Sequence, residues 1–264
     1  MAKKALCVGI NDYPLQDSDL RGCVNDARAW AALLTEHYDF AASDIKLLLD
    51  EDATRKQVLN GIKRLLRGAR AGDVLVFTNS SHGTYLLDRS GDDAKFDQAL
   101  CPHDIEDSLI LDDDLRELFA DVSPDAHVVA ILDNCHSGSG TRVLRQLDED
   151  TVRIRFLDPA LRGDPVLDED EEPPAGPPAH PESDMNELLL SGCTATESSF
   201  DARFGNVYHG AMSYYALKAI RDARYELTYA DLHDRLTASL RSTSFRQHPQ
   251  LEGRDEKKHR QVFV

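Results

Sequence analysis

Two apolar runs, each followed directly by polar residues, constrain the fold of this chain most strongly. Val128–Leu132 leads into Asp133, and Val74–Phe77 leads into Thr78 and Asn79. Short apolar runs bounded by polar turns are typical of strands buried on both faces, as in a parallel sheet covered by helices. Ligand and catalytic groups of such sheets gather beyond the carboxyl ends of the strands. The sequence therefore predicts a site where these two runs end.

Strand-like and helix-like segments alternate along the rest of the N-terminal half. We expect strands at 5–10, 45–49, 73–78 and 127–133, and helices at 26–36, 54–69 and 112–119. Thr54 and Gln57 are spaced as a capping box at the start of one of these helices. The alternation predicts an α/β fold with a mostly parallel sheet covered on both faces.

The composition changes between residues 157 and 184. This segment holds seven of the eleven prolines and nine acidic residues, with Arg162 as its only Lys or Arg. Since such a segment cannot bury enough apolar surface to order itself, we expect a disordered linker. The chain then reads as one domain, 1–264, in which a large part (1–156) and a small part (185–264) flank the linker (157–184).

The small part has its own expected elements. We expect a strand at 187–190, helices at 210–224 and 228–241, and a last strand at 261–264 that closes the sheet.

Charge and cysteine content exclude several classes of function. Acidic residues outnumber Lys and Arg by 47 to 30, for a net charge of −17, which argues against binding to a nucleic-acid backbone. The charge serves either solubility or the attraction of cations and basic peptides. Five scattered cysteines without a CxxC pair argue against a zinc site or a disulfide framework. No segment has membrane-spanning length and the apolar run after Lys4 is too short for a signal peptide, so we expect a cytoplasmic protein without a membrane partner.

A thiol and an imidazole follow the two strand ends. Cys135 lies just after the strand at 127–133, and His82 follows the other run. A thiol attacks as its thiolate and needs a base, for which His82 is a better candidate than His136, because adjacent residues at a turn usually point apart. The N–H groups of Gly83 and Cys135 are placed to hold an oxyanion. This combination predicts acyl transfer at a peptide bond.

Each of these residues has a simpler interpretation when taken alone. Cys135 could be a buried structural thiol, and His82 a loop histidine bonded to the backbone. A serine hydrolase that uses Ser137 or Ser139 is a third hypothesis, but the chain has no Gly-x-Ser-x-Gly elbow. Matching chemistry at two strand ends favours the cysteine nucleophile.

A series of short motifs covers most of the chain outside the acidic linker: Ala5–Ile10, Gly22–Ala27, Ser80–Gly83, Gly91–Asp93, Asp97–Pro102, Asp112–Leu115, Asp133–Gly138, Leu190–Cys193 and Gly210–Tyr214. In this order they resemble the metacaspases and bacterial caspase-like cysteine proteases. The resemblance implies a caspase-like three-layer α/β/α sandwich with a His82–Cys135 dyad. Asn79, Ser81 and Asn134 depart from the residues common in the family. The main alternative is a catalytically silent caspase-like module that regulates or binds a partner, although silent relatives typically lose one member of the dyad.

The resemblance also implies a substrate pocket for a basic side chain. In metacaspases, positions matching Cys23, Asp26, Ser80 and Asp133 line a pocket that accepts Arg or Lys. Two carboxylates are natural partners of a planar guanidinium, which favours Arg over Lys. Asp26 could instead be only a first-turn carboxylate favoured by the helix dipole. We expect protein or peptide substrates with basic residues, and the resemblance implies a monomer.

A second acidic cluster comprises Asp92, Asp93, Asp97 and the run 112–114. Calcium takes several oxygen ligands from flexible loops, but no EF-hand spacing is present. The resemblance implies that Asp97, Asp112 and Asp113 bind Ca²⁺. A solvated acidic loop is the alternative.

The linker offers a further means of control. Arg153, Arg155 and Arg162 lie at its edge or within it, where proteolysis is easiest. A protease that cuts after Arg could cut itself there, or an upstream protease could do so. The alternative is an exposed loop whose arginines offset the local acidic charge.

Overall fold

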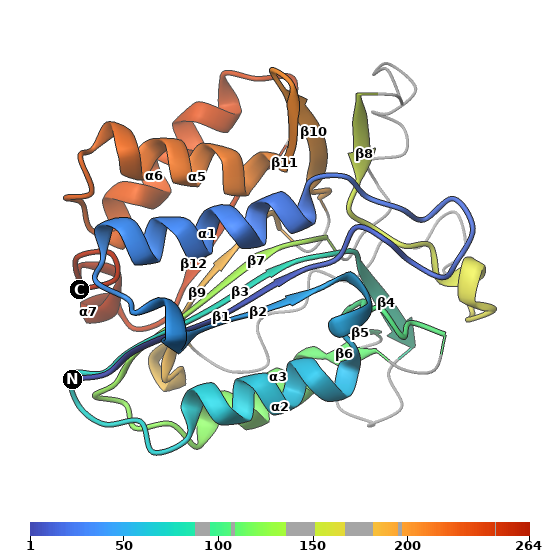
Figure 1. Ribbon diagram of the computed structural model, residues 1–264. Helices are drawn as coiled ribbons and strands as arrows, with labels where there is room; N and C mark the ends of the chain where they lie inside the picture. Colours follow the sequence, from blue (N-terminus) through green and yellow to red (C-terminus); the bar gives the residue numbers. More distant parts are fainter. Residues whose placement is uncertain (88–95, 107–108, 136–150, 167–181, 195–196, 246) are drawn as a thin grey trace.

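A six-stranded sheet runs through the centre of the protein (Figure 1). The structure is a computed structural model, and it describes all residues except 88–95, 107–108, 136–150, 167–181, 195–196 and 246. The strand order is β12-β9-β7-β3-β1-β2. Its strands are β1 (Lys3–Gly9), β2 (Ile45–Leu49), β3 (Val74–Ser80), β7 (His127–Asp133), β9 (Glu187–Ser191) and β12 (Gln250–Glu252). All neighbours are parallel except β12, which runs antiparallel to β9. The parallel strands place their carboxyl ends at one edge of the sheet.

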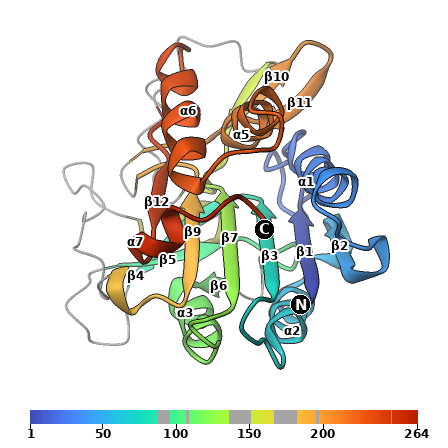
Figure 2. The same ribbon diagram turned by 90° about the vertical axis from the view of Figure 1, so that its left-hand side faces the viewer.

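Helices cover both faces of the sheet (Figures 1 and 2). One layer contains α1 (Cys23–His37), α5 (Ala211–Asp222) and α6 (Tyr229–Arg241), and the other contains α2 (Arg55–Leu66) and α3 (Asp112–Ala120). Alternate residues of each strand pack on opposite faces of the sheet: Val76 and Val129 belong to one apolar cluster, and Phe77 and Val128 belong to the other. This is the three-layer α/β/α sandwich expected from the sequence.

Two small sheets, missed by the sequence analysis, stand beyond the carboxyl ends of the main strands (Figure 1). One has the order β11-β10-β8 and the other β4-β5-β6. Their strands are β4 (Gly83–Leu87), β5 (Phe96–Leu100), β6 (Ile110–Leu111), β8 (Val152–Ile154), β10 (Phe200–Phe204) and β11 (Val207–Gly210). The other elements of the described residues are α7 (Asp255–Lys258) and short 3-10 helices at Ala42–Asp44, Asp50–Asp52, Pro159–Arg162 and Glu182–Asp184.

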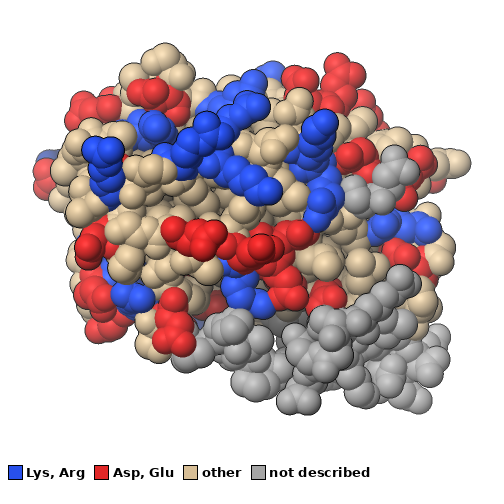
Figure 3. Space-filling model, turned by 90° about the horizontal axis from the view of Figure 1, so that it is seen from below, with Lys and Arg blue, Asp and Glu red and all other residues tan. Residues whose placement is uncertain are grey.

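Helix α2, which lies below the sheet in Figure 1, is amphipathic. Thr54 precedes α2 and its side chain accepts a hydrogen bond from the backbone of Gln57, as its capping position predicts. Val58 and Ile62 are buried, whereas the basic side chains of Lys56, Lys63 and Arg64 are exposed. Figure 3 shows this lower face, on which basic side chains gather in one band and acidic side chains in another.

One expectation about the C-terminal half is wrong, and another fails at the described ends of its segment. Residues 261–264 do not close the sheet, because β12 does so, and Val262 and Phe263 instead bury their side chains in the core. The linker is ordered at both described ends: Leu157 is 2% exposed, and residues 159–162 and 182–184 form 3-10 helices. Leu157 supplies the apolar burial that the average composition of the segment hides. Residues 167–181 lie outside the described part of the chain.

Candidate active site

Parallel pairing brings the two predicted strand ends together. Ser80 ends β3 and is paired in register with Asp133, which ends β7. Asp26, in the first turns of α1, completes the group, because the Ser80 hydroxyl donates to its Oδ2 at 2.8 Å. Both carboxylates are buried, with exposures of 0% for Asp26 and 1% for Asp133. The structure thus builds one acidic pocket from the predicted residues.

The side chain of Arg155 fills this pocket. Its Nη2 donates to Asp26 Oδ2 at 2.7 Å, and its Nη1 lies 3.2 Å from Asp133 Oδ2. Nη1 also donates to the Ser80 hydroxyl and to the main-chain carbonyl of Asp133. Arg155 is 0% exposed. Burial alone would lower the pKa of its guanidinium, but the surrounding negative charges, Asp133 foremost, raise that pKa well above its ordinary value.

Arg155 therefore corrects one hypothesis about the linker arginines. It is not an exposed residue that offsets local acid, because its ion pairs with Asp26 and Asp133 are fully removed from water. Arg153 is partly exposed and its guanidinium donates to the carbonyl of Asp19. Arg162 pairs with Asp164 at 3.4 Å, away from the two pocket carboxylates.

The small part of the chain supports the pocket, which the sequence analysis did not predict residue by residue. Asp133 accepts hydrogen bonds from the Ser199 hydroxyl at 2.6 Å and from the Ser213 N–H at 2.9 Å. Asp26 accepts from the Gly210 N–H and is paired with His209 Nδ1 at 2.8 Å. The motif at 210–214 was the available signal for two of these residues, while Ser199 and His209 stood in no distinctive pattern.

Two further groups surround the pocket. Cys23 is fully buried, and burial raises the pKa of its thiol well above the ordinary value, opposed by the positive charge of Arg155. Asp201 accepts hydrogen bonds from the N–H groups of Arg21 and Gly22, and its Oδ1 is buried without a partner. Burial also raises the pKa of Asp201. Asp201 therefore adds a third carboxylate near the guanidinium, whereas the Cys23 thiol is kept neutral by its raised pKa.

The backbone carbonyl of Arg155 meets the predicted oxyanion donors. Its oxygen accepts hydrogen bonds from the Gly83 N–H at 2.9 Å and from the Cys135 N–H at 3.3 Å. The backbones approach so closely that a Cβ at Gly83 would overlap the Cys135 carbonyl oxygen. The main chain next to His82 and that of Cys135 therefore both bond the carbonyl oxygen of Arg155.

His82 is oriented by its surroundings and is uncharged. It is 4% exposed, and its Nε2 lies 2.7 Å from the carbonyl oxygen of Ser18. A carbonyl can only accept, so Nε2 carries the proton, and Nδ1, which is buried without a hydrogen-bond partner among the described residues, is left as a base. Burial lowers the pKa of His82 to about 4, and the positive charges of Arg155 and Arg153 act in the same direction.

The predicted calcium residues are only partly assembled. Asp112 and Asp113 begin α3, and both pair with Arg116. Burial raises the pKa of Asp112 to about 6, with further contributions from Asp113 and Asp97, and its Oδ1 has no hydrogen-bond partner in the part of the chain that the structure describes. Within the described residues, no three His, Cys, Asp or Glu side chains are arranged to hold a metal ion. Asp92, Asp93, His136, Ser137 and Ser139 lie outside the described part of the chain.

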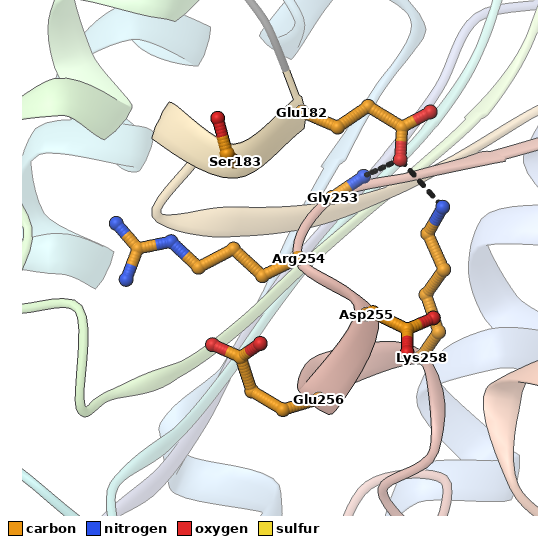
Figure 4. A pocket seen from close by; sticks show the side chains of 7 residues that line it. All are labelled: Glu182, Ser183, Gly253, Arg254, Asp255, Glu256 and Lys258. Atoms are coloured by element: carbon orange, nitrogen blue, oxygen red, sulfur yellow. Dashed lines mark hydrogen bonds and ion pairs between the residues drawn. The ribbon is translucent and has the colours of Figure 1, made fainter.

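A large cavity lies elsewhere. It has a volume of about 640 Å³ and is lined by Glu182, Ser183, Gly253, Arg254, Asp255, Glu256 and Lys258 (Figure 4). Glu182 accepts hydrogen bonds there from the Gly253 N–H and from Lys258 Nζ. Residues 182–184 precede the first residue of β9, so this cavity lies at the opposite edge of the sheet from the acidic pocket. None of its lining residues is a cysteine or a histidine. No helix in the described ranges is long and apolar enough to cross a membrane.

Comparison with known proteins gives a family for this arrangement. A model described as the metacaspase, peptidase C14 domain matches residues 3–143. Metacaspase-4 of Arabidopsis thaliana is 42% identical over 145 residues, covering 52% of this chain and 34% of that protein. Metacaspase-1 of the same plant is 29% identical over 257 residues, covering 91% of this chain and 65% of that protein. The chain thus spans less than two thirds of these relatives.

Solved structures share the fold at low identity. A protein from Geobacter sulfurreducens superposes with a TM-score of 0.74 at 22% identity, over 100% of this chain and 99% of that one. Caspase-1 from Spodoptera frugiperda gives a TM-score of 0.60 at 12% identity, over 95% of this chain and 86% of that one. The α/β/α sandwich described above is therefore a caspase-like fold.

Proposed function

This chain belongs to the metacaspase family of C14 peptidases, and we propose that it is a cysteine endopeptidase that cleaves peptide bonds after arginine. The placement of Arg155 carries the proposal: its guanidinium lies in the acidic pocket while its carbonyl oxygen accepts from the N–H groups of Gly83 and Cys135. A substrate arginine bound in the same way would present its carbonyl carbon beside the thiol. The substrates would be proteins or peptides with exposed basic residues.

In the proposed reaction, His82, Cys135 and the N–H groups of Gly83 and Cys135 each have one role. His82 Nδ1 takes the proton of the Cys135 thiol, the sulfur attacks the carbonyl carbon, and the two N–H groups hold the resulting oxyanion. The C–N bond then breaks, and the leaving amine takes the proton from His82. Water, deprotonated by the same imidazole, hydrolyses the thioester and releases Cys135. The uncharged state of His82 is the one that this cycle requires.

The preference for arginine over lysine follows from the shape of the pocket. The two terminal nitrogens of Arg155 divide their contacts between Asp26 on one side and Asp133 with Ser80 on the other. A lysine ammonium is a single point of charge and would satisfy fewer of these acceptors at once. We expect lysine to be cleaved more slowly and aspartate not at all.

The same contacts support a proposal about activation. While residues 152–157 lie in the site, no other peptide can enter it, so the intact chain is an inhibited precursor. Cleavage of the Arg155–Phe156 bond, by Cys135 of the same chain or by an upstream protease, would release it. Among Arg153, Arg155 and Arg162, only Arg155 has both its side chain and its carbonyl in the site.

Intact-mass measurements test self-cleavage. We expect the wild-type chain to yield fragments 1–155 and 156–264, and the Cys135→Ala and His82→Ala chains to stay whole. Arg162→Gln is the matched control and should be processed normally, whereas Arg155→Gln should not be cut at this bond. The same cut in Cys135→Ala protein would assign it to another protease. If neither the processed nor the intact form cleaves any peptide ending in Arg, Lys or Asp, the silent-module alternative is correct.

We also propose that Ca²⁺ stimulates the enzyme through Asp97, Asp112 and Asp113. Support comes from the unpartnered Oδ1 of Asp112 and from the electrostatic influence of the other two carboxylates on it. The described residues do not form a ready-made metal site, because Arg116 pairs with two of them, and no catalytic step above depends on the ion. Calorimetry should show Ca²⁺ binding to Cys135→Ala protein and its loss in the Asp112→Asn variant of that protein. Equal peptidase activity in calcium and in chelator would contradict stimulation.

A further inference from the structure

Residues 152–157 cross the candidate active site as an extended segment. β8 pairs antiparallel with β10, with Ile154 opposite Phe200 and Arg153 opposite Asp201. The pairing continues beyond the strand, because the Arg155 N–H donates to the Ser199 carbonyl at 2.9 Å. This is the mode in which an extended peptide adds a strand to a sheet edge.

We infer that this segment lies in the register of a substrate, so that its side chains specify what the enzyme prefers on either side of the arginine. The inference rests on the proposed function and extends it to the neighbouring positions. Counting outward from the bond after Arg155, Ile154 stands at P2, Arg153 at P3 and Phe156 at P1′. The preferred substrate is an extended segment with the order basic, aliphatic, arginine, aromatic.

The P2 position is apolar. Ile154 is 8% exposed and belongs to the same apolar cluster as Phe200 and Cys193. The ring of Phe200 is itself fixed against Phe245, at 5.4 Å between ring centroids. A branched aliphatic side chain fits these surroundings, whereas a carboxylate would be buried there without a partner, at high cost.

The P3 position favours a hydrogen-bond donor. Side chains alternate along a strand, so Arg153 lies on the same side as Arg155 and opposite to Ile154. Its guanidinium donates to the main-chain carbonyl of Asp19 and remains partly exposed. A carbonyl oxygen can only accept, so Arg or Lys is favoured at P3 and an acidic side chain is disfavoured.

The side chain at P1′ is aromatic and lies against an aromatic side chain of the enzyme. Phe156 stacks on Tyr85, with 5.9 Å between ring centroids and 22° between the planes. The chain beyond it is also held: the Leu157 N–H donates to the Gly83 carbonyl, and the Leu157 carbonyl accepts from the Thr84 hydroxyl. Contacts with the rest of the protein therefore hold the segment on both sides of the Arg155–Phe156 bond.

A set of four fluorogenic peptide substrates tests the inference. The parent is Val-Arg-Ile-Arg-Phe-Leu between a fluorophore and a quencher, and three variants carry Asp at P2, Glu at P3 or Glu at P1′, all with Arg at P1. The processed full chain is used, and ratios of kcat/KM are compared because they do not depend on the fraction of active enzyme. We expect each variant to fall by about tenfold or more, the scale on which pocket mismatches discriminate.

Two results would overturn the inference in distinguishable ways. Values of kcat/KM within twofold of the parent for all three variants would refute the register while leaving arginine cleavage intact. No cleavage of any of these peptides would refute the proposed function, and the inference with it. In the Tyr85→Ala enzyme, the ratio of kcat/KM between the parent and the P1′ variant should fall to about one, while the ratios for the P2 and P3 variants stay as in the wild type and serve as internal controls. An unchanged ratio for the P1′ variant would refute that subsite.

Discussion

Arg155 holds the candidate site together through ion pairs with Asp26 and Asp133. Such pairs contribute little on a protein surface, but here both partners are buried. A buried guanidinium loses its hydration, and its charge must be balanced by the groups around it. Asp26 and Asp133 supply that balance at 2.7 Å and 3.2 Å from the guanidinium nitrogens. The two carboxylates equally need Arg155, since without a cation they would be two buried negative charges close together.

Removing either carboxylate should therefore destabilise the intact chain. In the Cys135→Ala background, which prevents self-cleavage, we expect Asp26→Asn and Asp133→Asn each to lower the free energy of unfolding by about 3 kcal/mol. Denaturant unfolding followed by circular dichroism measures this. The matched control is Asp222→Asn, because Asp222 pairs with Lys218 on the surface, where both side chains are about half exposed. Pocket variants as stable as this control would contradict the assignment of buried ion pairs.

At the scale of elements, β8 is a short strand with one neighbour. It contains only residues Val152–Ile154 and pairs with β10 alone among the described strands. Such a strand has little stability of its own, so the side chain of Arg155 and the burial of Ile154 must hold it in place. Loss of the Arg155 contacts should free this element without unfolding the central sheet.

Hydrogen exchange tests that separation. In Cys135→Ala protein we expect Arg155→Gln to remove protection from the amides of residues 152–157, while the amides of β3 and β7 keep theirs. Arg203→Gln is the control, since Arg203 is an exposed residue of β10 whose guanidinium contacts only the nearby Asn206 among the described partners. Loss of protection throughout the sheet would show that β8 is not an independent element.

At the scale of the whole molecule, two buried histidines make stability depend on pH. Burial lowers the pKa of both His82 and His127 to about 4. The charges of Arg260, Lys257 and Lys3 act in the same direction on His127, and its Nδ1 bonds the Val264 carbonyl. The unfolded chain takes up these protons near pH 6.5, so between pH 6.5 and 4 the unfolded state binds more protons.

The free energy of unfolding should consequently fall as pH is lowered through this window. Each histidine contributes a slope of up to about 1.4 kcal/mol per pH unit. His127→Gln in the Cys135→Ala background should remove one such contribution, as measured by denaturant unfolding from pH 7 to 4. His259→Gln is the control, because His259 is 65% exposed, and it should leave the slope unchanged. Identical slopes for all three proteins would refute the role of His127.

Asp112 opposes the loss of stability at low pH, since a raised carboxyl pKa favours the folded state there.

The sequence predicted the parts of the fold that depend on local pattern. Unbroken apolar runs located β3 and β7, and the helical spacing of apolar residues located α1, α2, α5 and α6 to within a few residues. The small sheets escaped because their strands are short and mixed in character. Strand β12 is short and mixed in character too, and the apolar pattern of Val262 and Phe263 predicts a strand there because it is the same for residues that pair in a sheet and for residues that pack in a core.

By itself the sequence determined which side chains stand at the strand ends: Ser80, His82, Asp133 and Cys135 follow from the apolar runs that precede them. Only the tertiary structure decided what the acidic pocket holds. An arginine at the edge of an acidic, proline-rich segment is expected to be solvated, because hydration is the default for a guanidinium and its neighbours Ile154 and Phe156 offer it no partner. Its partners lie 129 and 22 residues away, on α1 and β7. Folding brings these charges together, and their mutual neutralisation outweighs the loss of water, which no local pattern can express.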